Sequence, residues 1–156
     1  MELQDKVVVI TGGSGGIGKA MGKAFLAEGA KSVVLVDLNL EAVEAAAKAL
    51  KCSSAVCNVT DESQIIELVE NVIAEHGQID LFCSNAGATS QGLLTDATND
   101  MWQSQWELHV MSHLYAARAV LPSMIERGDG YILNTASAAG LLAAIGSGPY
   151  TVTKAA

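Results

Sequence analysis

Short runs of β-branched residues, apolar at every position, alternate with longer segments whose apolar residues recur every three or four positions. The runs VVVI at residues 7–10 and VVLV at residues 33–36 contain no polar residue, which is typical of parallel strands covered by helices on both faces. Repeated βα units produce such an alternation. The pattern therefore predicts an α/β fold with three layers, in which one parallel sheet lies between two layers of helices.

The same pattern gives the order of the expected elements. We predict strands at residues 6–11, 32–37, 55–59, 79–84 and 130–136. Helices are expected at residues 16–28, 39–50, 61–76 and 100–127, followed by a last helix that starts near Tyr150. Pro122 lies inside the longest helical segment, and we expect a kink there because proline lacks the backbone N–H that the helix needs.

Composition excludes several classes of protein. Half of the residues are hydrophobic (50%) and only 17% are charged, so a folded core is expected rather than a disordered chain. The net charge of −8 provides no basic surface for nucleic acid. No apolar stretch is long enough to span a membrane, no export signal is visible, and the three cysteines without a CxxC pair suit a reducing compartment. We therefore expect a cytoplasmic protein that binds neither nucleic acid nor a membrane.

A glycine-rich run, TGGSGGIG at residues 11–18, joins the first predicted strand to the first predicted helix. Glycines there let the backbone turn tightly and approach a pyrophosphate, whose charge faces free N–H groups and the positive end of the helix dipole. Two registers fit the run: Gly13, Gly15 and Gly18 match G-x-G-x-x-G, while Gly12, Gly16 and Gly18 match T-G-x-x-x-G-x-G. A flexible turn without a ligand is the other interpretation. With this loop, the pattern favours a Rossmann-type, doubly wound sheet.

Asp37 ends the second predicted strand, roughly 20 residues beyond Gly18, as in dinucleotide-binding folds. A carboxylate at this place accepts hydrogen bonds from the ribose hydroxyls of an adenosine and repels a 2′-phosphate. Neither Gly13 nor Leu38 provides a cation that would relieve this repulsion. We therefore predict NAD rather than NADP as the cofactor, although Asp37 could also serve only as a helix N-cap.

Two further segments lie at the same expected edge of the sheet. Asn58 and Val59 end the third predicted strand, where the Asn amide could hydrogen-bond adenine or form a simple Asx turn. Asn85, Ala86 and Gly87 follow the fourth predicted strand. Small residues there let the loop lie against a cofactor, and the Asn85 amide can bridge adjacent strand ends.

Tyr150 and Lys154 are four residues apart in the last predicted helix, so they lie on one face within reach of each other. A phenol with a pKa of about 10 is almost entirely protonated at neutral pH, and a nearby ammonium lowers that pKa towards the range useful for acid/base catalysis. Ser137, just past the fifth predicted strand, could donate a hydrogen bond to the oxygen of a carbonyl substrate. Taken alone, the Tyr and Lys pair could also be an ordinary helix surface.

Together, these motifs resemble the short-chain dehydrogenase/reductase family in order and spacing, over the whole chain. The resemblance implies NAD(P)-dependent hydride transfer on a Rossmann fold. It implies Tyr150 as the catalytic acid/base, Lys154 as the residue that lowers the pKa of that tyrosine and holds the nicotinamide ribose, and Ser137 as the group that stabilises the substrate oxygen. The expected cofactor-binding residues are Gly12, Ser14, Gly16, Ile17, Gly18, Asp37, Leu38, Asn58, Val59, Asn85, Ala86, Gly87, Tyr150 and Lys154.

One position departs from the family pattern. Family members carry an Asn on the long helix to hold a proton-relay water near the lysine, and counting from Trp102 and Pro122 places His109 there. His109 could relay protons in place of that Asn, could be a packed structural residue, or could impair catalysis. The histidines His76, His109 and His113 do not cluster with cysteines or carboxylates at metal-ligand spacing, so we expect no metal.

The sequence stops early for this fold. A doubly wound nucleotide-binding sheet has two βαβαβ halves, and the second shows only two strands before Ala156. We expect residues 1–156 to be a single NAD-binding Rossmann domain, truncated at its C-terminus, with the last strands missing. The resemblance implies a homodimer or homotetramer in the full-length form.

Two functions stay open. The first is an NAD-dependent oxidoreductase that interconverts a small-molecule secondary alcohol and a ketone. The second is a catalytically silent dinucleotide-binding fragment of such an enzyme. A methyltransferase is disfavoured, because it gives no account of Ser137 with Tyr150 and Lys154.

Overall fold

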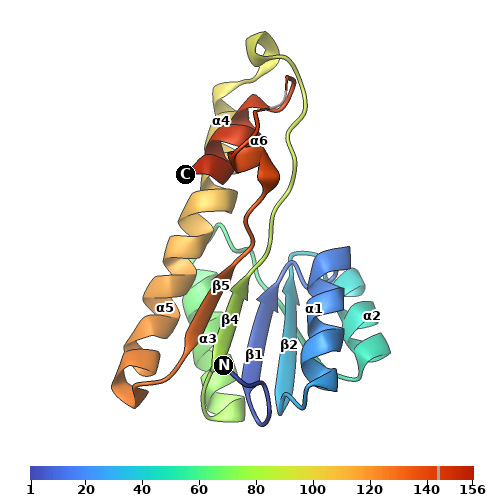
Figure 1. Cartoon of the computed structure of the whole chain (residues 1–156), viewed down its shortest axis with the longest axis vertical. Coiled ribbons are helices and arrows are strands. Elements are labelled where there is room, and N and C mark those ends of the chain that lie inside the picture. Colours follow the sequence, from blue (N-terminus) through green and yellow to red (C-terminus); the bar gives the residue numbers. More distant parts are fainter. Residues whose placement is uncertain (144) are drawn as a thin grey trace.

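A parallel sheet of five strands, in the order β3-β2-β1-β4-β5, forms the centre of the computed structural model, which describes residues 1–143 and 145–156 (Figure 1). After β3 the chain crosses back, so that β4 pairs with the other side of β1. Ligands of open α/β sheets bind outside the carboxyl ends of the strands, at the point where the strand order reverses. The strands are β1 (Val7–Thr11), β2 (Ser32–Asp37), β3 (Ser53–Val56), β4 (Leu81–Ser84) and β5 (Tyr131–Asn134).

Helices cover both faces of this sheet. One face carries α1 (Gly16–Ala27) and α2 (Leu40–Leu50), and the other carries α3 (Glu62–His76) and α5 (Ser112–Arg127). Two shorter helices, α4 (Asn99–Trp106) and α6 (Gly148–Ala155), lie beyond the carboxyl ends of the strands (Figure 1). The predicted three-layer, Rossmann-type α/β fold is confirmed.

The fully apolar strands are explained by this double covering. Side chains of a strand point to opposite faces in turn. Val7 and Val9 of β1 belong to the core beneath α3 and α5, whereas Val8 and Ile10 belong to the core beneath α1 and α2. All four side chains are buried, so a polar residue at any of these four positions would lie in an apolar core away from water.

The third strand lies earlier in the chain than expected. It was predicted at residues 55–59, but β3 ends at Val56. Asn58 turns the chain away from the sheet, because its Oδ1 accepts hydrogen bonds from the backbone N–H and the hydroxyl of Thr60 at 3.2 and 2.9 Å. The Asn58 carbonyl also accepts the N–H of Asp61 at 3.0 Å. This is the Asx turn that the sequence left open as one of two roles for Asn58.

The long helix, predicted as one element over residues 100–127 with a kink at Pro122, is interrupted by a turn that the sequence did not predict. A π-helical turn, η2 (Glu107–Met111), separates α4 from α5, whereas Pro122 lies within α5. Pro122 is exposed, so water can hydrogen-bond the carbonyl that its ring leaves without a partner. The interruption at η2 has a consequence for the site, because His109 is the buried residue of that turn.

Two neighbouring isoleucines of α3 test where the core lies. Ile65 is 1% exposed and belongs to the core beneath α3, whereas Ile66 is 45% exposed. We expect Ile65→Ala to lower the free energy of unfolding by about 2 to 5 kcal/mol, because it leaves a cavity among packed side chains. Ile66→Ala, the same chemical change one residue along, should cost about 0.5 kcal/mol or less. Urea denaturation followed by circular dichroism measures both; equal losses would contradict the assigned orientation of α3.

Candidate active site

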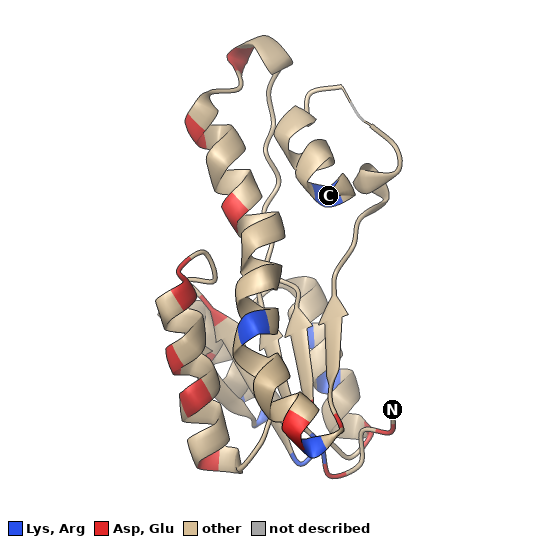
Figure 2. Cartoon of the chain, turned by 90° about the vertical axis from the view of Figure 1, so that its left-hand side faces the viewer, with Lys and Arg blue, Asp and Glu red and all other residues tan. Residues whose placement is uncertain are grey.

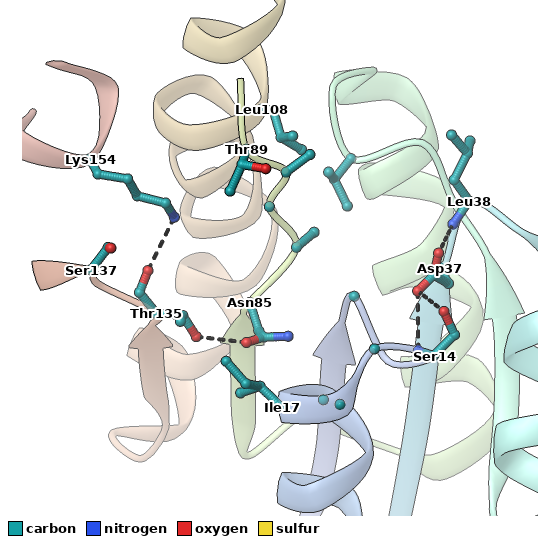
Figure 3. A pocket seen from close by; sticks show the side chains of 18 of the residues that line it. Ser14, Ile17, Asp37, Leu38, Asn85, Thr89, Leu108, Thr135, Ser137 and Lys154 are labelled. Carbon is teal, nitrogen blue, oxygen red and sulfur yellow. Dashed lines mark hydrogen bonds between the residues drawn. The ribbon is translucent and has the colours of Figure 1, made fainter. Parts of the chain in front are cut away.

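The carboxyl ends of the strands border a cavity of about 610 Å³. Every residue predicted for the site lines this cavity except Asn58 and His109. Figure 3 shows the two ends of the cavity, with Ser14, Asp37 and Leu38 on one side and Ser137 and Lys154 on the other. Its lining residues are Gly12, Ser14, Gly15, Gly16, Ile17, Gly18, Asp37, Leu38, Cys57, Val59, Asn85, Ala86, Gly87, Ala88, Thr89, Leu108, Thr135, Ala136, Ser137, Tyr150 and Lys154.

The glycine-rich loop is packed too tightly for side chains. A Cβ on Gly13 would lie 2.8 Å from the Cβ of Leu35 in β2, and a Cβ on Gly18 would collide with the carbonyl oxygen of Gly12. Gly12 itself has a φ of +64°, a conformation that favours glycine. Gly12, Gly16 and Gly18 line the cavity whereas Gly13 packs against β2, as the T-G-x-x-x-G-x-G register requires.

The start of α1 is open to an anion. Its N-cap residue, Gly15, has no side chain that could cap the helix, and the first turn contains no acidic residue. The first N–H groups of an α-helix have no partner within the helix, and the helix dipole makes this end positive. The loop therefore forms a cradle that fits the pyrophosphate of a dinucleotide.

Asp37 is held by the same loop. Its Oδ2 accepts the Ser14 hydroxyl at 2.6 Å and the Ser14 N–H at 3.1 Å, and its Oδ1 accepts the Leu38 N–H at 2.8 Å (Figure 3). Partial burial raises the pKa of Asp37, but the hydrogen bonds from Ser14, Asn39 and Leu38 outweigh this effect and keep the pKa below its ordinary value. Asp37 is therefore ionised at neutral pH.

Hydrogen bonds join the ends of three strands at the floor of the cavity. The Thr11 hydroxyl accepts the N–H groups of Asn85 and Ala86 at 2.9 and 3.1 Å, and donates to the Cys83 carbonyl at 3.2 Å. The side-chain amide of Asn85 donates to the Thr11 carbonyl at 3.0 Å and accepts the Thr135 hydroxyl at 2.9 Å. Asn85 thus connects β1 and β4 with the chain that leaves β5.

Tyr150, Ser137 and Lys154 converge at the opposite end of the cavity from Asp37. The Tyr150 hydroxyl donates to the Ser137 hydroxyl at 3.4 Å, and the Lys154 ammonium donates to the Thr135 carbonyl at 3.3 Å. Burial lowers the pKa of Lys154 from its ordinary value. All three side chains face one cavity, so a small molecule bound there can contact them together.

The two ends of the cavity carry opposite charges. Among the described residues that line it, Asp37 is the only carboxylate and Lys154 the only cation. The sequence contains no Lys or Arg between Lys51 and Arg118. Figure 2, which looks at the face covered by α3 and α5, shows that acidic residues dominate that face, above all along α3. A bound anion in the middle of the cavity must therefore be held by backbone N–H groups and not by side-chain cations.

His109 lies behind Tyr150 and does not line the cavity. Its Nε2 accepts the Ala88 N–H at 3.3 Å, and its Nδ1 lies 2.9 Å from the Thr153 hydroxyl. The His109 and Tyr150 rings meet edge to face with 5.2 Å between their centroids. Burial, with smaller contributions from Lys154 and His113, lowers the pKa of His109 to about 4.

Three contact residues were missed by sequence reasoning. The Thr135 carbonyl accepts a hydrogen bond from the Lys154 ammonium, and the Thr153 hydroxyl contacts the His109 ring. The Ser90 hydroxyl accepts the Tyr150 N–H at 3.2 Å. Each is a single hydroxyl residue without a characteristic spacing, so only the fold identifies it. Conversely, Asn58 was predicted to contact a cofactor, but its neighbours Cys57 and Val59 line the cavity and Asn58 does not.

The fold and the cradle define a Rossmann-type, dinucleotide-binding class of protein. A family model described as short chain dehydrogenase matches residues 6–156. The chain is 33% identical over 162 residues to an uncharacterised oxidoreductase of Staphylococcus saprophyticus, covering 100% of this chain and 69% of that protein. It is 36% identical over 160 residues to the 3-oxoacyl-[acyl-carrier-protein] reductase FabG of Thermotoga maritima, covering 99% of this chain and 65% of the reductase. The chain therefore belongs to the short-chain dehydrogenase family of oxidoreductases.

Solved structures agree with this assignment. A short-chain dehydrogenase/reductase from Burkholderia phymatum in complex with NAD superposes with a TM-score of 0.95 at 27% identity, covering 99% of this chain and 57% of that one. An NAD+-bound xylitol dehydrogenase gives a TM-score of 0.90 at 29% identity, covering 99% of this chain and 62% of that one. The chain thus spans about three-fifths of these structures.

The described residues contain neither a membrane-spanning helix nor a metal-binding cluster. No helix there combines the length and the apolar character that a membrane span requires. Within the same residues, no group of three or more His, Cys, Asp or Glu side chains lies close enough together to hold a metal ion.

The Thr11 hydroxyl allows a test of the cavity floor. Thr11→Val keeps the shape but removes the acceptor of two backbone N–H groups, which costs about 1 to 3 kcal/mol for each group left without a partner. We expect the variant to lower the free energy of unfolding by at least about 1 kcal/mol in urea denaturation. Thr11→Ser retains the hydroxyl and should lie within about 1 kcal/mol of the parent. A valine variant as stable as the parent would show that the hydroxyl is dispensable.

Proposed function

We propose that this chain is the core of an NAD-dependent oxidoreductase that interconverts a small-molecule secondary alcohol and a ketone. The observation that carries the proposal is the convergence of Tyr150, Ser137 and Lys154 on one wall of a cavity whose other end offers the glycine cradle and Asp37. In this arrangement a phenol, a hydroxyl donor and a cation lie where a dinucleotide would present its reactive end.

Each part of the cavity suits one part of NAD. The loop around Gly12, Ser14, Gly16, Ile17 and Gly18 would hold the pyrophosphate, because its glycines leave room and α1 begins without a cap. Asp37 would accept the hydroxyls of the adenosine ribose. Leu38 and Val59 would border the adenine, and the small residues Asn85, Ala86 and Gly87 would lie along the middle of the molecule. The NAD complexes of the Burkholderia protein and of xylitol dehydrogenase support this choice of cofactor.

Tyr150 is the proposed acid/base. NAD, when bound, would supply the acceptor for a hydride from the carbinol carbon. Tyr150, as phenolate, takes the proton of the substrate hydroxyl, and in the reverse direction the phenol returns a proton to the carbonyl oxygen. Ser137 donates a hydrogen bond to that same oxygen, which stabilises the charge developing on it. The Tyr150 and Ser137 hydroxyl oxygens lie 3.4 Å apart, close enough to contact one substrate oxygen.

Lys154 has two proposed roles. It lies one helical turn from Tyr150 in α6, so its positive charge would stabilise the negative charge left on the phenol oxygen when Tyr150 gives a proton to the substrate. The Thr135 carbonyl holds the ammonium at 3.3 Å and keeps it at the cavity, where it would also bind the nicotinamide ribose.

Further features of the whole protein belong to the same proposal. The cysteines Cys52, Cys57 and Cys83 are unpaired, which supports a reducing, cytoplasmic setting. A homodimer or homotetramer is the assembly that we propose for the full-length form. Because the chain spans only part of its relatives, activity, substrate and assembly are all proposed for the whole protein.

Removing one oxygen from Tyr150 tests the acid/base role. We expect Tyr150→Phe to reduce NADH formation from secondary alcohols by about 10²-fold or more, because this change removes the proposed acid/base group. NADH binding, followed by its fluorescence, should change less than about threefold. Tyr131→Phe, the same change on a half-exposed side chain of β5, should leave the rate unaltered.

The parent chain itself distinguishes the two functions that the sequence left open. A parent that binds NADH but oxidises no alcohol would identify a dinucleotide-binding fragment without turnover. Equal rates for Tyr150→Phe and the parent would remove Tyr150 from the mechanism.

Asp37 tests the choice of cofactor. Asp37→Asn keeps the shape of the side chain but removes the charge that repels a 2′-phosphate, so the preference for NAD over NADP should fall by about tenfold, or about 1.4 kcal/mol. Dissociation constants for NADH and NADPH, measured by calorimetry, give this ratio. Asp100→Asn removes an exposed charge on α4 and serves as the control. An unchanged ratio in Asp37→Asn would contradict the proposed ribose contact.

A further inference from the structure

We propose that His109 is a positioning residue, held as one uncharged tautomer with its proton on Nδ1, that fixes α6 against the loop after β4 and carries no protons itself. The proposal rests on the proposed function, because the residues that α6 presents to the cavity are Tyr150 and Lys154.

The hydrogen bonds around the ring have only one consistent direction. The Ala88 backbone N–H, at 3.3 Å, can only donate, so Nε2 must accept and carries no hydrogen. The proton of the neutral ring is then on Nδ1, which donates to the Thr153 hydroxyl at 2.9 Å. The Thr153 hydroxyl in turn donates a shared hydrogen bond to the carbonyls of Pro149 and Tyr150, at 2.9 and 3.1 Å. Carbonyls can only accept, so the chain of bonds ends there.

A proton carrier needs a nitrogen that can both take and release a proton. Both ring nitrogens of His109 already have hydrogen-bond partners. The chain of hydrogen bonds starts at the Ala88 N–H, which can only donate, and ends at the Pro149 carbonyl, which can only accept. A second proton on the ring would lie on Nε2 and point at the Ala88 N–H, so two donors would face each other without an acceptor. The titratable groups that face the ring are Tyr150 and Lys154 on α6 and His113 on α5, and the cation of Lys154 opposes a charge on the imidazole. The pKa of about 4 agrees with this geometry.

The contacts of His109 reach both functional residues of α6. Thr153 lies between Tyr150 and Lys154 in the sequence and is itself buried, at 3% exposure. The ring edge of His109 also packs against the Tyr150 ring, with an interplanar angle of 83°. His109 thereby restrains the helix through Thr153 and the phenol through direct packing.

The backbone makes room for this histidine. His109 is the buried residue of the π-helical turn η2, and such turns frequently occur at functional sites. A Cβ at position 87 would lie 3.4 Å from the His109 Nε2, so the ring lies within van der Waals reach of Gly87 in the loop after β4. Both features place a large ring where it joins the loop after β4 to α6.

The tautomer is tested without any catalysis. Nitrogen-15 NMR of histidine-labelled chain resolves the three residues His76, His109 and His113, and His109→Gln assigns the signal of interest. We expect the His109 ring to keep its proton on Nδ1, without titrating, from pH 5.5 to pH 8. Titration of that ring between these values, or a proton on Nε2, would overturn the proposal.

Activity of the whole protein supplies a second, independent readout. Thr153→Val removes the partner of Nδ1 without touching the imidazole, and we expect it to lower kcat about tenfold with little change in the KM for NAD. His109→Gln should lower kcat by a similar factor, and the double variant should be no worse than either single one. Thr153→Ser, which keeps the hydroxyl, should restore kcat to within about twofold of the parent.

A proton-carrying His109 predicts a different pattern. In that case His109→Gln alone would lower kcat and alter its pH profile, while Thr153→Val would keep the parent's rate, and the proposal would fail. A protein that turns over no alcohol at all would refute the proposed function but not the tautomer, which the NMR measurement decides.

Discussion

The network of hydrogen bonds around the Thr11 hydroxyl is the interaction on which the site depends. Parallel strands bring their carboxyl ends to one edge, but at the reversal of strand order the chains leaving β1 and β4 diverge towards opposite faces. Thr11 and Asn85 join these ends and reach Thr135 beyond β5. Since the Thr135 carbonyl also accepts a hydrogen bond from the Lys154 ammonium, the floor of the cavity is joined to the wall that carries Lys154. A one-residue shift at β1 would therefore disturb both the glycine loop and α6.

The two ends of the cavity differ in charge, with Asp37 at one end and Lys154 at the other. An acidic protein of net charge −8 repels a dinucleotide at long range, so attraction must be local. The open N-terminus of α1 would supply it at the pyrophosphate, and Lys154 would supply it at the far end. Asp37 remains ionised because Ser14 and the following backbone N–H groups satisfy its oxygens. The ribose hydroxyls would have to share this carboxylate with Ser14, which couples the acid to the loop that holds the phosphates.

Periodicity and spacing carried most of the information about this fold. Strands such as VVVI are buried on both faces, so their composition alone identifies a covered parallel sheet. The predictions failed where single hydrogen bonds decide a boundary. Asn58 ends β3 through its bonds to Thr60, and no periodicity records such a turn. The long helix is interrupted at η2, which the hydrophobic periodicity does not mark, whereas Pro122 lies within α5. Thr153 and Ser90 act through contacts that exist only after folding.

The buried cation of the cavity, Lys154, destabilises the folded state. Burial lowers the pKa of Lys154, which means that the folded state holds this ammonium less favourably than water does. A group whose pKa falls on folding destabilises the folded state wherever that group is charged, so at neutral pH Lys154 opposes folding. His109 avoids the same penalty by staying neutral and hydrogen-bonded. Burial thus lowers the pKa of both Lys154 and His109, and the hydrogen-bond partners of His109 suit its neutral form.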